Sequence, residues 1–375
     1  MIRVVHVIAG LEVGGVQTML LRLVSRMDGA AFHNQVIVLT GGGELRPLLI
    51  RAGATVAELG MRPGVPDPRG LWRLVAELRR HKTDVLQTWM YHSDLMGGLA
   101  ARWTNKPRVV WGLHSESLPS AQTAWHAWLS AKFCVRLSYH LPDRIVCVSE
   151  TGRKWHVRYG YNERLITVIP NGFDTDCFRP DGAAYHAIRQ ELGLAADAVI
   201  VGHVGRFDPQ KDQRGLMRAA AHVLEKRPNV HFLLCGHGID SKNSLLREWI
   251  GDTGRAGHFH LLGVRSDIER VTAAMDVMAL SSKTEAFASC VGEAMACAVP
   301  VVTTAVGDLP QVVGDTGVLV PPRDPDALAS GILGLLAAPD ERCRLGVAAR
   351  LRVQRLFGLD RMVRAYEDCY RQVLT

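Results

Sequence analysis

Short runs of β-branched and other apolar residues alternate with longer segments of helical periodicity along the whole chain. In the first half, seven such runs predict strands at residues 3–8, 35–39, 55–59, 85–88, 109–111, 144–148 and 166–169. Helices are predicted between them, for example at residues 16–27, 71–80 and 124–138. This alternation is typical of parallel sheets built from βαβ units.

A cluster of turn residues, Pro170-NGFDTDCFRP, interrupts the rhythm near residue 175. The alternation then resumes, with strands predicted at residues 199–204, 231–235, 260–262, 277–280, 299–303 and 317–320. We predict an N-terminal domain at residues 1–172, a C-terminal domain at 173–355 and a C-terminal helix at 356–375. The predicted fold class is α/β, with two doubly wound Rossmann-like domains facing each other across a cleft. Ligands of such sheets bind at the carboxyl ends of the strands.

Size and composition agree with two soluble domains. The 375 residues exceed the length at which one hydrophobic core stops growing, and 47% of them are hydrophobic. Apolar runs are too short to span a bilayer, and the N-terminus lacks the pattern of a signal peptide. The eight cysteines show neither C-x-x-C nor zinc-like spacing. We therefore expect a cytoplasmic protein that needs no metal or other cofactor.

Charge is distributed unevenly between the halves. Residues 1–172 carry 21 Lys and Arg against 12 Asp and Glu, whereas residues 173–375 carry 23 against 25. A basic first half favours an anionic partner such as nucleic acid, a membrane surface or a phosphorylated substrate. A solvated basic surface without a partner is the alternative. No recognised nucleic-acid-binding module accompanies the charge, so we expect no nucleic-acid partner.

Two segments at predicted strand-to-helix junctions carry candidate anion-binding residues. Gly10-LEVGGVQ lacks the G-x-G-x-x-G pattern, but it places Gly14 and Gly15 at a helix N-terminus, where bare amides favour an anion. Val204-GRFDPQKDQ places Arg206 and Lys211 on the loop before a helix that starts near Asp212. Two such cations can hold a diphosphate. The alternatives are a plain turn and an exposed basic loop.

The segment EAFASCVGEAM, residues 285–295, places Glu285 in a loop and Glu293 about one turn into the following helix. Ser289 is the predicted N-cap of that helix, and the amides of residues 288–291 are predicted to be free. Amides suit phosphate and carboxylates accept hydrogen bonds from hydroxyls, so the segment favours a sugar nucleotide. A Glu on an exposed helix face is the alternative.

Taken in order, Gly14-Gly15, Ile169-PNG, Arg206…Lys211 and Glu285…Glu293 resemble the retaining GT-B glycosyltransferases of family four. The resemblance runs through the whole chain. The segments Thr88-WMYHSDLMGG and Trp111-GLHS are similar to those of bacterial enzymes that assemble lipopolysaccharide or exopolysaccharide. A nucleotide-sugar epimerase of the same fold and a two-lobed ligand-binding protein are the alternatives.

The resemblance implies a role for each matching residue. Arg206 and Lys211 would neutralise the donor diphosphate, Glu285 would hold the donor sugar and Glu293 the ribose. The amides of Phe287, Ala288, Ser289 and Cys290 would approach sugar and phosphate. Gly14 and Gly15 would contact phosphate, His114 would lie beside the reacting centre, and Gly263 and Val264 would contact the base. The donor would be a UDP-sugar in preference to a GDP-sugar, and the acceptor a lipid-linked saccharide bound by the first domain.

Two departures from the family pattern bear on the donor. Ala288 and Ser289 follow Phe287 where relatives commonly carry Pro or Gly, and Gln311 stands where many carry Glu. Asp174-Thr175-Asp176 spells the D-x-D metal motif of another glycosyltransferase fold, but here it reads as turn residues of the linker. The Ser-His-Asp combinations near residues 92–94 and 114–115 lack a G-x-S-x-G elbow, which disfavours a hydrolase.

The segment from Thr123 combines Trp125, Trp128 and Phe133 with Lys132 at helical spacing. Aromatic and basic residues on one helix are typical of an interfacial helix. A domain helix that buries one aromatic face is the alternative. Together with the basic first half, this segment favours an anionic membrane surface as a peripheral partner, at the inner face of the cytoplasmic membrane.

Overall fold

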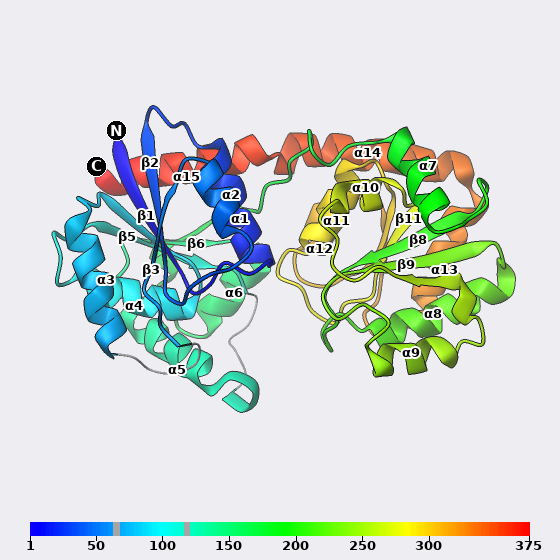
Figure 1. Cartoon of the computed structure of the whole chain (residues 1–375), viewed down its shortest axis with the longest axis horizontal. Coiled ribbons are helices and arrows are strands. Elements are labelled where there is room, and N and C mark those ends of the chain that lie inside the picture. The colour runs from blue at the N-terminus through cyan, green and yellow to red at the C-terminus, as the bar shows by residue number, and fades with distance from the viewer. Residues whose placement is uncertain (63–67, 116–120) are drawn as a thin grey trace. The chain divides into compact units, whose positions relative to one another are not determined.

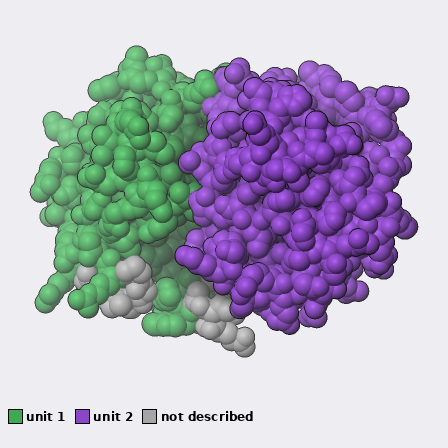
Figure 2. Space-filling model, turned by 45° about the vertical axis from the view of Figure 1, so that its right-hand side comes forward, with its two compact units in different colours: residues 1–172, 359–375 green, residues 173–358 purple. Residues whose placement is uncertain are grey.

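The structure is a computed structural model that describes residues 1–62, 68–115 and 121–375. The chain divides into two compact units, residues 1–172 with 359–375 and residues 173–358 (Figure 2). Each unit is built around one parallel sheet with helices on both of its faces (Figure 1). No helix in these described ranges is long and apolar enough to cross a membrane.

The first unit contains a seven-stranded sheet in the order β3-β2-β1-β4-β5-β6-β7. Its strands are β1 Ile2–Ile8, β2 Phe32–Val38, β3 Thr55–Glu58, β4 Val85–Thr88, β5 Arg108–Leu113, β6 Arg144–Cys147 and β7 Ile166–Val168. Its helices are α1 Gly15–Arg26, α2 Arg46–Arg51, α3 Pro68–Arg80, α4 Tyr91–Ala101, α5 Ala121–Leu137, α6 Glu150–Arg158, η1 Glu163–Leu165 and α15 Leu359–Leu374. Helix α1 contacts α2 and α15, and α4 contacts α3 and α5 (Figure 1).

The second unit contains a six-stranded sheet in the order β10-β9-β8-β11-β12-β13. Its strands are β8 Val199–Val204, β9 Val230–Cys235, β10 Phe259–Leu261, β11 Val277–Leu280, β12 Val301–Thr304 and β13 Val318–Val320. Its helices are α7 Gly182–Glu191, α8 Gln213–Lys226, α9 Ser244–Gly251, η2 Ala256–His258, α10 Ile268–Ala273, α11 Ser289–Ala296, α12 Leu309–Val313, α13 Pro325–Ala337 and α14 Pro339–Phe357. Helix α8 contacts α9 and α13, whereas α11 contacts α10 and α14.

Alternate residues of the central strands enter different cores, as a doubly covered parallel sheet requires. In β1, Val4 and Ile8 belong to the core beside α1 and α15, whereas Val5 and Val7 belong to the core beside α3 and α4. All these side chains are buried. This burial on both faces explains why the strands read as continuous apolar runs in the sequence. The prediction of two doubly wound parallel α/β units is confirmed.

Several predicted element boundaries differ from the structure, and three of the differences have a clear physical reason. Strand β12 begins at Val301, since Ala298 has a φ of +58° and the Val299 amide donates to the Ala294 carbonyl at 3.0 Å instead of joining the sheet. Strand β2 begins three residues before the prediction, at Phe32, because it pairs along the full length of β1. The C-terminal helix predicted at 356–375 is α15, which begins at Leu359 because α14 extends to Phe357 and the chain breaks at Gly358, and α15 belongs to the first unit.

Candidate functional site

Two loops that follow neighbouring strands of the second sheet carry five residues of the predicted site, Arg206, Lys211, Glu285, Phe287 and Ala288. Strand β8 ends at Val204 and β11 at Leu280, and these strands pair in parallel. The loops at residues 205–212 and 281–288 therefore leave the same edge of the sheet as neighbours. The first loop leads into α8 and the second into α11.

Lys211 and Glu285, one from each loop, form an ion pair. The Lys211 Nζ lies 2.5 Å from Glu285 Oε1, and the side chains are 17% and 10% exposed. Ser282 Oγ donates to the same carboxylate oxygen at 2.6 Å. Burial is the largest effect on the pKa of Lys211 and lowers it, but the charge of Glu285, the nearby Cys290 and the hydrogen bond to Glu285 together more than offset it. The pKa therefore stands above the usual lysine value. The site therefore keeps a charged ammonium in a largely buried position.

Further hydrogen bonds join the two loops into one scaffold. Ser281 Oγ donates to the carbonyls of Lys211 and Asp212, at 2.8 and 3.1 Å. The Lys283 amide donates to the Gln210 carbonyl at 2.7 Å, and its Nζ lies 3.0 Å from Asp212 Oδ1. These bonds fix the position of Lys211 through its backbone as well as its side chain.

Arg206 lies on the same loop, as predicted, but it is not gathered with Lys211 around Glu285. Its side chain is 65% exposed and its Nε donates to Asp208 Oδ2 at 2.9 Å. The side-chain Nε2 of Gln213 donates to the Arg206 carbonyl at 2.8 Å and holds the backbone of Arg206 in place. The guanidinium is thus on the surface, where rotation of its side chain can bring it to an anion.

Helix α11 begins one residue away from the predicted position. Ala288, with a φ of +41°, is the N-cap, and Ser289 is the first helical residue. Phe287 explains the tight entry, since its buried ring stacks on Phe173 with centroids 5.8 Å apart. The Val291 amide, predicted to be free, donates to the Ala288 carbonyl at 3.0 Å. The prediction of Ser289 as N-cap was therefore wrong.

Cys290 and Glu293 follow within the first two turns of α11, and both are half-buried. Burial is the main cause that raises the pKa of the Cys290 thiol, to about 12, although Lys211 works against it. The thiol is therefore protonated at neutral pH and a poor nucleophile. Glu293 is less buried than its apolar neighbours in the sequence suggest.

The loop after β10 contains Gly263 and Val264. Gly263 adopts a φ of +65°, its amide donates to the Ile239 carbonyl at 2.8 Å, and its carbonyl accepts from the Gly236 amide at 2.8 Å. These bonds tie it to the loop after β9. Val264 is 62% exposed. The loop therefore offers an apolar side chain on a fixed backbone at the carboxyl edge of the sheet.

Gly14 and Gly15 lie in the first unit, between β1 and α1. Gly14 is the extended N-cap of α1, and no side chain caps this helix. Gly15 is exposed, and a Cβ added to it would meet no atom within 4 Å. The start of α1 thus presents open space and amides that lack a side-chain cap, as the sequence predicted.

His114 directly follows β5 in the first unit. Its ring stacks on that of Trp89, with centroids 4.9 Å and planes 30° apart. Burial lowers the pKa of His114 to about 3, so the imidazole is neutral at physiological pH. Its Nε2 has no hydrogen-bond partner among the described residues.

Three residues near these sites escaped the sequence analysis. Ser282 holds Glu285, Trp89 stacks on His114, and His203 lies buried in β8. His203 Nδ1 lies 3.1 Å from the Ala279 carbonyl and donates to it. Its Nε2 is consequently an acceptor, without a partner in the part of the chain that the structure describes. For His203, the sequence offered one signal, a histidine inside an otherwise apolar strand.

The two disfavoured motifs have structural roles. Asp174 Oδ1 accepts from the amides of Asp176 and Cys177, at 3.1 and 3.0 Å, which makes the D-x-D segment a side-chain-stabilised turn. His92 Nδ1 lies 3.4 Å from Ser130 Oγ, and Asp94 is buried and bonded to Thr88. Within residues 1–62, 68–115 and 121–375, no group of three or more His, Cys, Asp or Glu is arranged to hold a metal ion.

Solved structures share this architecture. The crystal structure of Anabaena HepE in complex with UDP and glucose superposes with a TM-score of 0.88, at 22% identity over 99% of this chain and all (100%) of that one. WaaG, a glycosyltransferase involved in lipopolysaccharide biosynthesis, superposes with a TM-score of 0.79, at 15% identity over 98% and 99% of the two chains. The fold of the chain is that of the GT-B glycosyltransferases.

Family models match both units. The model of Glycosyltransferase Family 4 matches residues 13–177, and the model of Glycosyl transferases group 1 matches residues 198–338. The two matches together span most of the chain. Each unit therefore matches a glycosyltransferase model, family 4 in the first unit and group 1 in the second.

Curated relatives match part of the chain. A D-inositol 3-phosphate glycosyltransferase of Xylanimonas cellulosilytica is 35% identical over 225 residues, 57% of this chain and 53% of the relative. The UDP-Gal:alpha-D-GlcNAc-diphosphoundecaprenol alpha-1,3-galactosyltransferase of Escherichia coli is 28% identical over 251 residues, 64% of this chain and 62% of the relative. The chain thus spans about half to three fifths of the length of these relatives.

Proposed function

We propose that this protein transfers a hexosyl unit, with retention of configuration, from a nucleoside-diphosphate sugar to a lipid-linked saccharide in the biosynthesis of a cell-surface polysaccharide. The observation that carries the proposal is the Lys211–Glu285 pair, in the group 1 domain at the carboxyl edge of its sheet. A largely buried, charged ammonium suits a diphosphate, and a carboxylate beside it suits sugar hydroxyls.

Each site residue has a part in binding the donor. Lys211 binds the diphosphate, Arg206 turns from Asp208 to join it, and Glu285 accepts hydrogen bonds from the donor sugar. Glu293 accepts from the ribose, and the amides of residues 287–290 approach sugar and phosphate. Gly263 and Val264 cover the base. Crystal structures of HepE with UDP, with UDP and glucose and with UDP-glucose support UDP in preference to GDP.

Charge stabilisation supplies most of the proposed catalysis. As the glycosidic bond breaks, negative charge grows on the leaving diphosphate, and Lys211 and Arg206 stabilise it. Cys290, the thiol in the site, is protonated and a poor covalent nucleophile. We therefore propose attack on the same face of the sugar that the diphosphate leaves, without a covalent intermediate.

The first unit would supply the acceptor side. The amides at Gly14 and Gly15 suit a phosphate of the donor, and His114, whose pKa of about 3 makes it a weak base, is able to accept a hydrogen bond from an acceptor hydroxyl. The Escherichia coli relative is named for a diphosphoundecaprenol-linked sugar, which supports a lipid-linked acceptor. The name of the Xylanimonas relative favours a second candidate, an inositol phosphate acceptor.

Helix α5 supports a peripheral membrane association. Trp125, Leu129 and Phe133, spaced four residues apart, are 56%, 39% and 52% exposed. Lys132 Nζ lies 4.7 Å from the centre of the Trp128 ring. The alternative that this helix buries its aromatic face does not hold for Trp125 and Phe133. An exposed apolar stripe beside cations in a basic unit fits an anionic bilayer.

A transfer assay tests the proposal. The full chain is incubated with UDP-sugars and GDP-sugars, each with either membrane lipid extract or inositol 3-phosphate, and products are identified by mass spectrometry. We expect UDP release and a hexose added to a lipid-linked saccharide, with retained anomeric configuration by NMR. Conversion of the donor without an acceptor product would identify an epimerase, and binding without turnover would identify a ligand-binding protein.

A further inference from the structure

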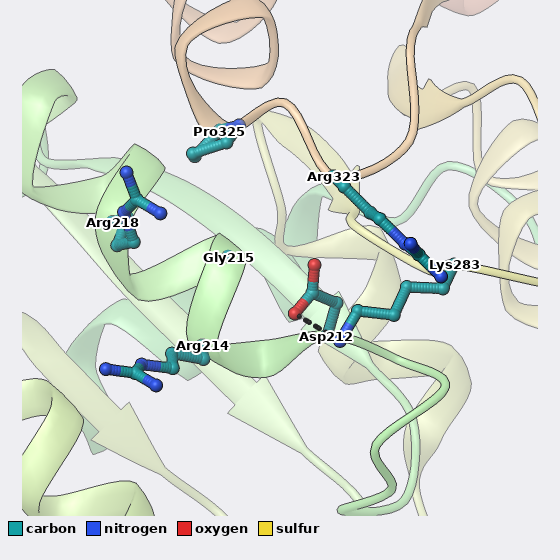
Figure 3. Close-up of a pocket in the computed structure, with 7 residues that line it drawn as sticks. All are labelled: Asp212, Arg214, Gly215, Arg218, Lys283, Arg323 and Pro325. Carbon is teal, nitrogen blue, oxygen red and sulfur yellow. Dashed lines mark ion pairs between the residues drawn. The ribbon is translucent and has the colours of Figure 1, made fainter.

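A cavity of about 450 Å³ opens in the second unit, between the first turns of α8 and the segment that leads into α13. Figure 3 shows its lining residues, which are Asp212, Arg214, Gly215, Arg218, Lys283, Arg323 and Pro325. Four of these seven are cations and one is an acid. None of the seven is among the predicted donor-site residues.

The four cations come from three separate segments. Arg214 and Arg218 lie one turn apart on α8, Lys283 follows β11, and Arg323 follows β13. Overall basicity does not explain the cluster, because residues 173–375 carry fewer Lys and Arg than Asp and Glu, 23 against 25. Like charges four residues apart on a helix are mildly destabilising. A bound anion would offset that repulsion.

The backbone beside the cavity is left-handed at two points, Asp212 with a φ of +50° and Arg323 with a φ of +62°. An Asp tolerates this region, whereas an Arg rarely adopts it, so the strain lies at Arg323. The side chain of Arg323 runs toward Lys283 (Figure 3). Strained residues of this kind cluster at ligand sites.

Lys283 links the cavity to the Lys211–Glu285 site. Its Nζ lies 3.0 Å from Asp212 Oδ1, the contact drawn as a dashed line in Figure 3. An anion in the cavity would compete with Asp212 for this ammonium. Asp212 directly follows Lys211, and Ser281 Oγ donates to the carbonyls of both residues. The two places therefore share one stretch of backbone.

We infer that this cavity is a binding site for a small phosphate-bearing anion, separate from the donor site. Arginine forks bind phosphate oxygens in pairs, and three arginines and one lysine line the cavity, with Arg214 and Arg218 on one side of it and Lys283 and Arg323 on the other (Figure 3). The cavity volume of about 450 Å³ lies within the range of pockets that bind small ligands, about 300–1,000 Å³. The cavity can therefore hold a ligand larger than one phosphate group. The site goes beyond the proposed transferase function, and its geometry belongs to the second unit alone.

Calorimetric titration of the full chain with inorganic pyrophosphate, in the presence of excess UDP and at fixed ionic strength, tests the site. We expect binding that weakens at least tenfold in the double variant Arg218→Gln/Arg323→Gln. The matched control is Arg247→Gln/Arg255→Gln, which removes two exposed arginines of the same unit outside the cavity. The control should bind pyrophosphate like the unchanged chain. Equal affinity in all three proteins would overturn the inference.

The variant Asp212→Asn provides a gain of affinity that misfolding cannot imitate. It removes the acid of the cavity and frees Lys283, so pyrophosphate should bind several-fold more tightly. Unchanged or weaker binding would contradict the assignment. Titration with inorganic phosphate and with glucose 6-phosphate then separates a free phosphate site from a phosphate-ester site. UDP binding is measured in parallel. If UDP does not bind, the result counts against the proposed transferase function, and the arginine variants still test pyrophosphate binding in the cavity.

Discussion

Lys211 and Glu285 lie 74 residues apart in the chain, and their charged atoms are 2.5 Å apart in the structure. The pair forms because β8 and β11 are neighbours in the sheet, which places the ends of both strands at one edge. Without a ligand, each charge compensates the other in a position that is largely shielded from water. A diphosphate and a sugar would take over these two roles in the donor complex.

The first prediction concerns the stability of this pair. Lys211→Met leaves the Glu285 carboxylate buried without its counter-ion, so the second unit should lose about 3 kcal/mol of unfolding free energy. The double variant Lys211→Met/Glu285→Gln should recover much of this loss. Urea denaturation of the full chain, followed by tryptophan fluorescence and circular dichroism, measures both changes.

Arg206→Met is the matched control for that experiment. Its side chain is 65% exposed in its pair with Asp208, so the cost should stay below about 1 kcal/mol. Strictly additive losses for Lys211→Met and Glu285→Gln would contradict the coupling inferred from the structure.

The second prediction uses the half-buried imidazole of His114, whose Nε2 is shielded from solvent. Its pKa of about 3 in the folded protein lies below the ordinary histidine value of 6.5, so the unfolded chain binds the proton more readily. This contribution to stability is complete above pH 6.5 and is lost as the pH falls toward 3. At pH 5 the loss from His114 alone should be about 2 kcal/mol.

The variant His114→Gln isolates that contribution. Between pH 7.5 and pH 5, its first unit should lose about 2 kcal/mol less stability than the unchanged first unit. Urea denaturation at the two pH values measures the difference. Parallel pH profiles for the two proteins would show that His114 titrates normally and is not buried as described.

The order of strands and helices along the chain could largely be predicted from the sequence, because strands that are buried on both faces form continuous apolar runs. All thirteen predicted strands exist, since each is flanked by turn residues and helical segments. Helix ends were harder, because their positions depend on tertiary contacts. Phe287 packs on Phe173, which lies 114 residues earlier, and this contact sets the start of α11 at Ala288–Ser289.

Candidate site residues were found where a loop follows a strand, but their pairing was not. The sequence predicts the same role for Arg206 and Lys211, two cations on one loop. In the folded unit Lys211 pairs with Glu285, whereas Arg206 pairs with Asp208. The basic cavity was missed because its cations come from three segments without a common motif. Such a cluster exists only after the sheet brings these segments together.

The third prediction concerns α5 and the membrane. Trp125→Ala/Phe133→Ala should weaken salt-sensitive co-sedimentation with anionic vesicles at least several-fold, because both side chains are exposed and available to insert. The thermal stability should change little for the same reason. Trp72→Ala, another exposed Trp of the first unit on α3, serves as the control. A folded unchanged chain that stays in solution with anionic vesicles at low salt would end the membrane proposal.

The fourth prediction concerns metal ions. Transfer should continue in excess EDTA, because the side chains of Lys211 and Arg206 supply the charge that stabilises the diphosphate. The Asp174-Thr175-Asp176 segment uses Asp174 to stabilise its own turn. Rates with EDTA, and with EDTA followed by magnesium or manganese, measure the dependence. Complete loss with EDTA and recovery with either metal would reverse this account.

The central claim is that the Lys211–Glu285 site binds a nucleoside diphosphate, and calorimetric titration with UDP tests it most directly. Lys211→Met is compared with Lys226→Met, a variant at the opposite end of α8, where the lysine is exposed. Charge-assisted hydrogen bonds contribute about 1.5–3 kcal/mol, so the affinity for UDP should fall about 10- to 100-fold in Lys211→Met. It should stay unchanged in Lys226→Met. Equal UDP affinity in Lys211→Met and the unchanged chain would contradict the claim.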